Sequence, residues 1–239
     1  LNTMLEALKP VLEELSQGQS LMGILSNYAT DSLVTASCRI AFRYLSRQRD
    51  QGREIAEKIA LASQFAQADP YRAATHNKGI FNGIDAVLIA TGNDWRAIEA
   101  GAHAFASREG HYQGLSQWTL DLEREELIGE VTLPMPVATK GGSIGLNPRV
   151  ALSHELLGNP SAKELAQIIV SIGLAQNFAA LKALVSTGIQ QGHMKLQAKS
   201  LALLAGASEA EVAPLVERLI ADKTFNLETA QRYLENLRS

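Results

Sequence analysis

Three short clusters place ionisable side chains among glycine, asparagine and other small residues. They contain Lys78, Asp94 and His193. A lysine can stabilise a developing oxyanion, an aspartate beside it can fix its geometry, and a histidine can donate a proton near neutral pH. The clusters read Ala-Thr-His-Asn-Lys-Gly-Ile at 74–80, Ala-Thr-Gly-Asn-Asp-Trp-Arg at 90–96 and Gly-His-Met at 192–194. Together they indicate chemistry that places negative charge on an oxygen.

Each of these side chains also has a simpler structural explanation. Most lysines are exposed, so Lys78 fits a solvated lysine in a stretch, 71–83, that reads as a polar loop. Asp94 stands just before a helix-like stretch, where aspartate is a favoured N-cap. A lone histidine at a helix start, such as His193, is more often structural or exposed than functional. The functional interpretation requires Asp94 to be buried beside Lys78, because an adjacent ammonium group keeps a buried carboxylate charged.

Two further residues flank Lys78 and could bind a substrate. Arg72 suits bidentate capture of a carboxylate, and the alternative is a surface salt bridge. Asn82 adds a polar side chain to the same stretch. The glycines of 141–145 match neither the P-loop nor the Rossmann spacing, so this segment is interpreted as a turn.

No metal site is expected. His103 and His111 are eight residues apart, no His-Glu-x-x-His motif occurs, and Cys38 is the single cysteine. One cysteine forms no internal disulfide, which fits a reducing compartment.

The composition is that of a soluble globular protein, with 239 residues, 46% hydrophobic and 20% charged. The net charge is −3 and no basic stripe with interleaved aromatic residues occurs, so no nucleic-acid partner is expected. No apolar run approaches the roughly 20 residues that span a bilayer, and the first residues do not read as a signal peptide. The expected location is therefore the cytoplasm, without a membrane partner.

Apolar residues at helical spacing and Ser-x-x-Glu capping boxes predict a chain rich in helices. The expected helices cover 3–16, 53–68, parts of 84–106, 162–187, a segment from near His193, a segment after Ser208, and about 226–237. The expected strands cover 21–26, 38–44 and a hairpin over 115–121 and 127–133. A glycine-containing loop is expected over 141–148.

Six motifs resemble class II (bacterial-type) 3-hydroxy-3-methylglutaryl-coenzyme A (HMG-CoA) reductase. They are Tyr71–Gly79, Asn82–Asp85, Ala90–Arg96, Glu99–His103, Gly173–Asn177 and Gly188–Met194. The likeness runs over essentially the whole chain. It implies an oxidoreductase of the mevalonate pathway of isoprenoid metabolism, which interconverts HMG-CoA and mevalonate plus coenzyme A. Two hydride transfers with NADH or NADPH accomplish this reaction.

The resemblance also implies roles for individual residues. Lys78 matches the catalytic lysine that holds the carbonyl oxygen, Asp94 its aspartate partner, and His193 the acid that protonates the departing thiolate. The matched binding residues are Arg72 for the free carboxylate of the substrate, Asn82 for a nearby polar contact, Gln176 for coenzyme A and Asn27 for a position near the nicotinamide.

The implied fold is α+β. Residues 1–30 would end a small ferredoxin-like cofactor domain, 31–187 would form the later part of a helix-rich large domain, and 188–239 would form a small all-helical C-terminal domain. A homodimer or higher assembly is expected. The family's catalytic glutamate and dinucleotide motif would lie upstream of Leu1, so the isolated 1–239 chain is expected to be inactive.

Two alternatives remain open from the sequence. The first is a non-catalytic fragment that binds coenzyme A or dimerises. The second is an unrelated lyase or aldolase with a Schiff base at Lys78, which leaves the match around His193 unexplained.

Overall fold

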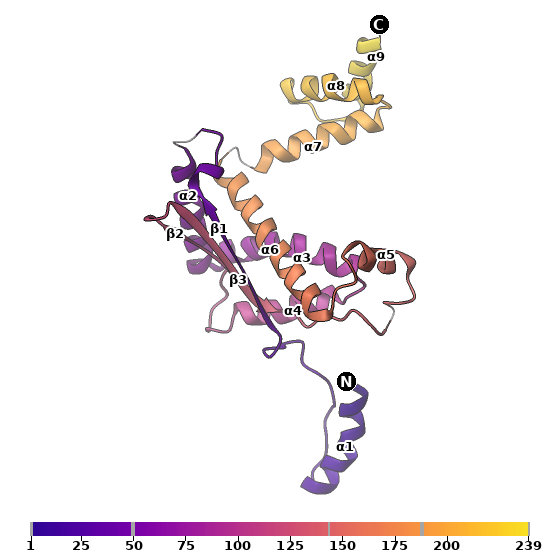
Figure 1. Ribbon diagram of the computed structural model, residues 1–239. Helices are drawn as coiled ribbons and strands as arrows, with labels where there is room; N and C mark the ends of the chain where they lie inside the picture. Colours follow the sequence, from indigo (N-terminus) through magenta and orange to yellow (C-terminus); the bar gives the residue numbers. More distant parts are fainter. Residues whose placement is uncertain (1, 49–50, 143, 187–188, 239) are drawn as a thin grey trace. The chain divides into compact units, whose positions relative to one another are not determined.

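The computed structural model describes residues 2–48, 51–142, 144–186 and 189–238, without the side chains of 189–193 and 195. The chain divides into two compact units, residues 1–179 and 180–239. The first contains a three-stranded antiparallel sheet with helices, and the second contains helices (Figure 1). The predicted α+β class is confirmed. The predicted domain boundaries at 30/31 and 187/188 stay predictions, and 187–188 lie outside the described residues.

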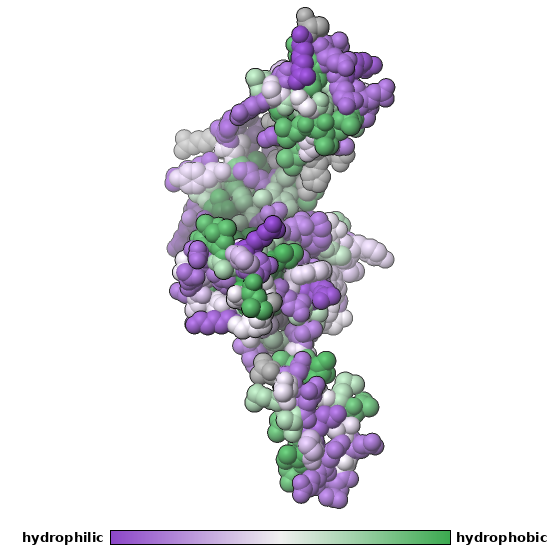
Figure 2. Space-filling model, turned by 90° about the vertical axis from the view of Figure 1, so that its right-hand side faces the viewer, coloured by the Kyte–Doolittle hydropathy of each residue, from purple (hydrophilic) through white to green (hydrophobic). Residues whose placement is uncertain are grey.

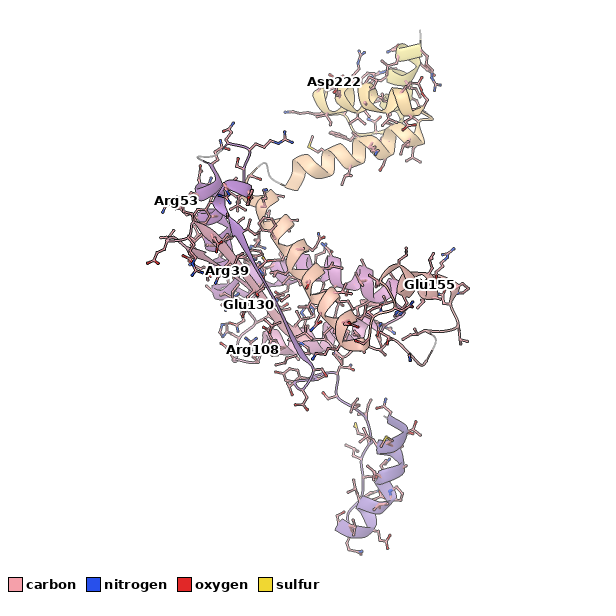
Figure 3. The ribbon with its side chains drawn as sticks, viewed as in Figure 1. Arg39, Arg53, Arg108, Glu130, Glu155 and Asp222 are labelled. Carbon is pink, nitrogen blue, oxygen red and sulfur yellow. The ribbon has the colours of Figure 1, made fainter. Side chains whose placement is uncertain are left out.

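The sheet has the strand order β1-β3-β2, from β1 (Leu33–Ala41), β2 (Ser116–Asp121) and β3 (Glu126–Pro134). β2 and β3 form the predicted hairpin, with Gly129 opposite Trp118. A side chain at position 129 would collide with the Trp118 ring, so glycine leaves room for the indole. On the sheet surface Arg39, labelled in Figure 3, pairs with Asp121 at 3.6 Å and with Glu126 at 3.2 Å.

The segment before the sheet contains one confirmed helix and one wrong strand. α1 (Asn2–Ser16) confirms the helix predicted over 3–16, although none of its described residues is buried. Figure 2 shows apolar side chains open to the surface in this part of the chain. The strand predicted over 21–26 is wrong, because these residues have no regular structure. Leu21 is 87% exposed and Ile24 68%, so these apolar side chains are open to solvent.

β1 begins earlier and ends earlier than the predicted strand over 38–44. After Ala41 the chain turns into a short 3-10 helix, η1 (Phe42–Tyr44). The Phe42 N–H donates to the carbonyl of Glu125 at 2.9 Å, and Gly52 packs directly on the Phe42 carbonyl. These contacts turn the chain out of the sheet where the alternation alone predicts that the strand continues.

The main correction concerns residues 71–83, which form the first part of α3 (Pro70–Ala90) and not a loop. α2 (Gln51–Ala68) ends before Asp69-Pro70, as predicted. The Asp69 carboxylate accepts hydrogen bonds from the N–H groups of Tyr71 (3.3 Å) and Arg72 (3.1 Å). Pro70 occupies the first turn, where a missing N–H costs no helical hydrogen bond.

Packing explains why α3 is helical in spite of its polar and glycine-containing sequence. Its buried positions recur every three or four residues, but two of them are polar. They are Ala73, His76, Asn77, Ile80, Phe81, Gly83, Ile84 and Leu88. A Cβ at Gly83 would lie 3.0 Å from the Cβ of Gln176 on α6 (Ala162–Val185). The glycine therefore permits α3 and α6 to cross at close distance, which offsets its low helix propensity.

α6 begins at the predicted capping box. The Ser161 N–H donates to Glu164 at 2.8 Å, and the Glu164 N–H donates to the Ser161 hydroxyl at 3.3 Å. By length and composition α6 could cross a membrane, a property that the sequence analysis did not detect. Leu165 and Ile169 are nevertheless fully buried, and Gly173 packs against Ile84 of α3. In all, 33% of its most apolar 18-residue window is buried.

Two shorter helices complete the first unit. α4 (Trp95–Ala106) confirms the helix expected within 84–106. α5 (Pro148–Leu156) begins where the predicted loop ends and was not expected. Asn147 caps it by accepting from the Arg149 N–H at 3.0 Å.

The second unit contains the end of α6, followed by α7 (Ile189–Leu204), α8 (Glu209–Ala221) and α9 (Leu227–Arg238). The last three confirm the predicted C-terminal helices. Its core is apolar: Ala198, Ala202, Leu215, Val216, Leu219, Ala230 and Leu234. The predicted capping box at Ser208 and Glu211 is confirmed. Arg238 binds Glu211 at 2.8 Å and so connects the end of α9 to the start of α8.

Candidate active site

The exposed face of α3 carries two of the predicted site residues. Lys78 and Asn82 are both exposed and are four residues apart, a spacing that places side chains next to each other on a helix. Among the described residues, no ion pair engages Lys78. Its ammonium group is thus available to an external oxygen atom.

Arg72 lies two turns before this pair and is half-buried. Burial lowers the pKa of its guanidinium. The surface salt bridge that the sequence leaves open for Arg72 is not among the ion pairs of the described chain. A partly desolvated cation without a carboxylate partner favours binding of an anionic ligand.

Asp94 occupies the position that its structural explanation predicts. It is the N-cap of α4, and its Oδ1 accepts a hydrogen bond from the Ala97 N–H at 3.2 Å. The side chain is exposed, and no ion pair of the described residues joins it to Lys78. The buried Lys78–Asp94 pair required by the functional interpretation is therefore not formed in this structure.

Close helix packing positions Gln176 and Asn27. Gln176 is exposed on α6, and its Cβ contacts α3 at Gly83, the residue after Asn82. Gln176 and Asn82 therefore emerge from neighbouring turns of two crossing helices. The exposed Asn27 belongs to the segment before β1, and its backbone carbonyl packs directly on Gly101 of α4.

His193 belongs to α7 in the second unit. Its side chain lies outside the described residues, so its role stays a prediction.

A buried polar network lies on the inner face of α3, and sequence reasoning missed it. His76 Nε2 is 2.6 Å from the hydroxyl of Ser116 on β2. That hydroxyl donates to Asn177 Oδ1 at 2.8 Å, and the Trp118 indole N–H donates to the same oxygen at 2.7 Å. Burial, and then the charge of Arg72, lower the pKa of His76 to about 4. His76 is therefore neutral at physiological pH.

Asn77 makes a second set of buried contacts beside this network. Its amide nitrogen donates to the Tyr112 hydroxyl and to the Gln113 carbonyl, both at 3.0 Å. Its oxygen accepts from the Leu115 N–H at 2.8 Å. The signal that could have revealed both sets is the spacing of His76 and Asn77 with Ala73 and Ile80, which is that of a helix face.

Asp85 and Glu99 form a carboxyl pair from α3 and α4. Burial and then Glu99 raise the pKa of Asp85 to about 6. The Asp85 Oδ1 atom is buried without a hydrogen-bond partner in the described chain.

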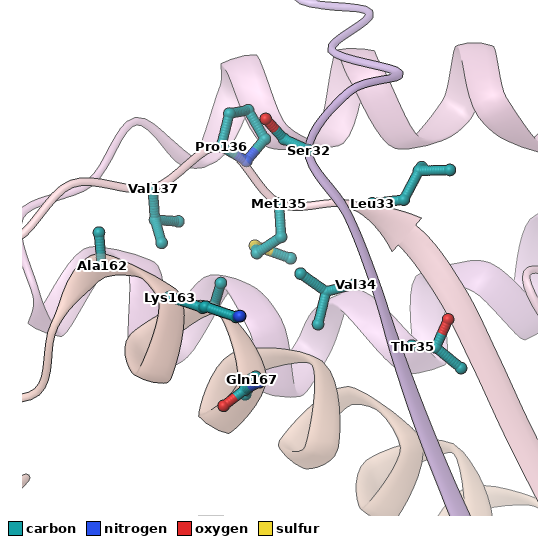
Figure 4. A pocket seen from close by; sticks show the side chains of 11 residues that line it. Ser32, Leu33, Val34, Thr35, Met135, Pro136, Val137, Ala162, Lys163 and Gln167 are labelled. Atoms are coloured by element: carbon teal, nitrogen blue, oxygen red, sulfur yellow. The ribbon is translucent and has the colours of Figure 1, made fainter.

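A cavity of about 400 Å³ lies elsewhere in the first unit and contains none of the predicted site residues (Figure 4). It is lined by the start of β1, the segment after β3 and the start of α6, with Lys163 and Gln167 extending from α6. No group of three side chains suited to a metal ion occurs in the part of the chain that the structure describes.

Comparison with known proteins decides the family. The sequence model described as hydroxymethylglutaryl-coenzyme A reductase matches residues 1–198, which include all three clusters. The chain belongs to this family. The resemblance to class II HMG-CoA reductase found in the sequence is thereby confirmed.

Two curated HMG-CoA reductases illustrate the relationship. The chain is 45% identical over 238 residues to the enzyme of Archaeoglobus fulgidus, covering 100% of this chain and 53% of that protein. It is 40% identical over 184 residues to the probable reductase of Borreliella burgdorferi, covering 77% of this chain and 42% of that protein. The chain thus spans about half the length of the curated relatives it matches.

Solved structures of the Streptococcus pneumoniae HMG-CoA reductase are similar as well. One has 95% sequence identity and a TM-score of 0.77, over 99% of this chain and 56% of that chain. A second, described as the class II reductase bound to NADPH in open conformations, has 95% identity and a TM-score of 0.76. The match covers 100% of this chain and 58% of that chain.

Proposed function

We propose that the complete protein containing this chain is an HMG-CoA reductase of the mevalonate pathway. It interconverts HMG-CoA and mevalonate plus coenzyme A by two hydride transfers with NADH or NADPH. The observation that carries the proposal is the family match over residues 1–198, because it includes the Lys78, Asp94 and His193 clusters. The exposed Lys78–Asn82 face beside Gln176 supports it.

In this proposal Lys78 stabilises the oxygen on which negative charge develops. Its ammonium group engages no ion pair in the described chain, so it can bind the substrate oxygen directly. A fixed donor of this kind contributes about 3 kcal/mol to transition-state stabilisation. Asp94 is not paired with Lys78 in this structure; its proposed role is to orient Lys78 through Oδ2, because its capping hydrogen bond uses Oδ1. His193 is proposed as the acid that protonates the thiolate of coenzyme A as it departs.

The binding residues follow the same logic. The half-buried Arg72 binds the free carboxylate of the substrate, with Asn82 as a polar contact and Gln176 against coenzyme A. A nicotinamide cofactor supplies the hydride when bound. Asn27 fits a position near its carboxamide, because an amide offers both a donor and an acceptor and the backbone of Asn27 is held against Gly101.

We further propose a homodimer or higher assembly in the cytoplasm, without nucleic-acid or membrane partners. The proposed domains are the end of a small ferredoxin-like cofactor domain at 1–30, the later part of a large domain at 31–187, and a helical C-terminal domain at 188–239.

A non-catalytic fragment that binds coenzyme A or dimerises is the alternative, favoured by the share of the relatives that the chain spans. The two are separated by measuring HMG-CoA-dependent oxidation of NADPH and NADH with the complete protein and with residues 1–239 alone. We expect turnover only with the complete protein. Turnover by residues 1–239 would overturn the proposed inactivity of this fragment, and an inactive complete protein would overturn the proposed function.

The role of His193 is tested with His193→Gln in the complete protein. Reduction of HMG-CoA should fall about 100-fold, whereas reduction of the free aldehyde intermediate should fall much less, because only the thioester step expels a thiolate. His111→Gln, at an exposed histidine, is the control and should leave both rates unchanged. Equal losses on the two substrates would remove His193 from this role.

A further inference from the structure

The inner face of α3 contains a chain of hydrogen bonds whose direction is fixed by its first member. An indole N–H can only donate, so the Asn177 atom 2.7 Å from Trp118 Nε1 is the amide oxygen. That oxygen can only accept, so the Ser116 hydroxyl, 2.8 Å away, donates to it. Ser116 has a single hydroxyl hydrogen, which this bond uses.

The position of the proton on the His76 ring follows from the single hydrogen of the Ser116 hydroxyl. Because the Ser116 hydroxyl has no hydrogen left, its oxygen accepts from His76 Nε2 at 2.6 Å, and Nε2 carries the proton. His76 Nδ1 is buried without a partner in the described chain. With a proton on Nε2, the Asn177 Nδ2 atom 3.3 Å away cannot donate a hydrogen bond to it. Either tautomer therefore leaves one buried N–H group of the network without an acceptor among the described residues, and the single hydrogen of the Ser116 hydroxyl decides between them.

The chain of bonds joins the two helices that carry binding and catalytic candidates. His76 lies one turn after Arg72 and two residues before Lys78, and Asn177 directly follows Gln176. All four network residues are at most 2% exposed, so none touches a ligand. Their influence on a reaction must act through the backbone positions of α3 and α6.

We propose that the Trp118–Asn177–Ser116–His76 network is a positioning device for the site, and that it fixes His76 as the neutral Nε2–H tautomer. It holds the α3 turns of Arg72 and Lys78 in one register against the α6 turn of Gln176. The positioning role rests on the proposed function, whereas the tautomer does not. Burial and the nearby Arg72 charge disfavour a second proton on His76, which would leave Nδ1–H without an acceptor.

The tautomer is tested by nitrogen-15 NMR of the histidine side chains in the complete protein, with His76 assigned by its loss in His76→Gln. We expect a neutral ring protonated at Nε2 from about pH 8 down to about pH 5. A ring protonated at Nδ1, or one that becomes charged near pH 6.5, would overturn the assignment.

The positioning role is tested with Ser116→Ala, and Thr119→Ala, at an exposed hydroxyl of the same strand, is the control. Because misplacement by about 1 Å can cost about 100-fold, we expect Ser116→Ala to lower kcat/KM for HMG-CoA by at least about tenfold well below its melting temperature. The control should match the wild type. A lower melting temperature with unchanged kcat/KM would show a purely structural role and overturn the proposal.

A second pair of variants keeps the test decisive if Ser116→Ala does not fold. A glutamine amide can replace Nε2–H, whereas an asparagine amide reaches only the place of Nδ1. His76→Gln should therefore retain kcat/KM within about threefold and His76→Asn should not. Equal loss in both would overturn the positioning role. An inactive wild-type protein would overturn the proposed function and this role with it, while the NMR result decides the tautomer by itself.

Discussion

The two units differ in where their polar side chains lie. The first buries His76, Asn77, Ser116 and Asn177 and engages the side chain of each in hydrogen bonds, although His76 Nδ1 has no partner among the described residues. In the described part of the second unit the fully buried side chains are apolar, and polar contacts such as Glu211–Arg238 lie on its surface. Its buried Thr224 hydroxyl oxygen has no hydrogen-bond partner among the described residues. Buried hydrogen bonds tolerate only one arrangement of their elements, whereas an apolar core tolerates small shifts. The first unit is therefore the one built to hold side chains at fixed positions.

We expect the largest change in the free energy of unfolding from a substitution in the apolar core of the second unit. Leu215 is fully buried there, so Leu215→Ala should lower the free energy of unfolding of this unit by about 3 kcal/mol. Leu203→Ala, at a leucine 56% exposed, should change it by less than about 0.5 kcal/mol. Denaturant unfolding followed by circular dichroism measures both. Similar values for the two variants would contradict the described core.

Loss of one hydrogen-bond donor, the Trp118 indole N–H, should lower the stability of the first unit. Trp118→Phe removes the indole N–H from Asn177 and leaves unfilled volume, so it should destabilise this unit by about 2 kcal/mol. Trp95→Phe is the control, because Trp95 is 38% exposed and outside the network. Chemical denaturation compares the variants, and an equal cost at both positions would mean that the network adds nothing.

A change at the Asp85–Glu99 pair should stabilise the first unit. The folded pKa of Asp85, about 6, exceeds the ordinary value of 3.8, so the ionised carboxylate destabilises the fold above about pH 6 and no longer does so below 3.8. After allowance for solvent screening, Asp85→Asn should raise stability by about 1 kcal/mol near neutral pH. Thermal melts at pH 7 and pH 3.5 measure this gain. An equal gain at both would exclude a charge effect.

We expect the smallest change in stability from the Glu211–Arg238 pair at the surface of the second unit. Hydrogen bonds from Arg238 and Ser208 lower the pKa of Glu211 to about 2. Its contribution to stability is therefore complete above the ordinary value of 4.5 and is lost as pH falls from 4.5 towards 2. Arg238→Gln should weaken this pH dependence, and added salt should do the same to the wild type. Melting curves of the helical signal over this range measure it; a pH dependence unchanged in Arg238→Gln would refute the pairing.

Local signals predicted much of the fold. Capping boxes identified the starts of α6 and α8, and the charged turn between alternating segments identified the β2–β3 hairpin. Asp69-Pro70 marked the end of α2, but it also caps α3, whose residues 71–83 were expected to form a loop. The buried face of α3 contains His76 and Asn77, and polar residues in a core conceal the apolar period that predicts a helix.

The site was predicted only in part because its parts come together by tertiary contact. Residue types and motif matches selected Lys78, Arg72 and Asn82 as candidates within an expected loop, and the structure places them on α3. No spacing in the sequence connects His76 with Ser116 and Asn177, which lie 40 and 101 residues away. The prediction of a strand over 21–26 was wrong for the same reason, namely that it depends on tertiary contact. An apolar run forms a strand only where another strand pairs with it.

We propose that the outer face of α3 performs chemistry while its inner face holds structure. This proposal is tested most directly by the turnover of Lys78→Ala in the complete protein, with Lys58→Ala, at an exposed lysine of α2, as the matched control. We predict that Lys78→Ala lowers HMG-CoA-dependent NADPH oxidation at least about 100-fold while its unfolding free energy stays within about 0.5 kcal/mol of the wild type. The control should keep its rate. A near-normal rate for a folded Lys78→Ala protein would contradict the account.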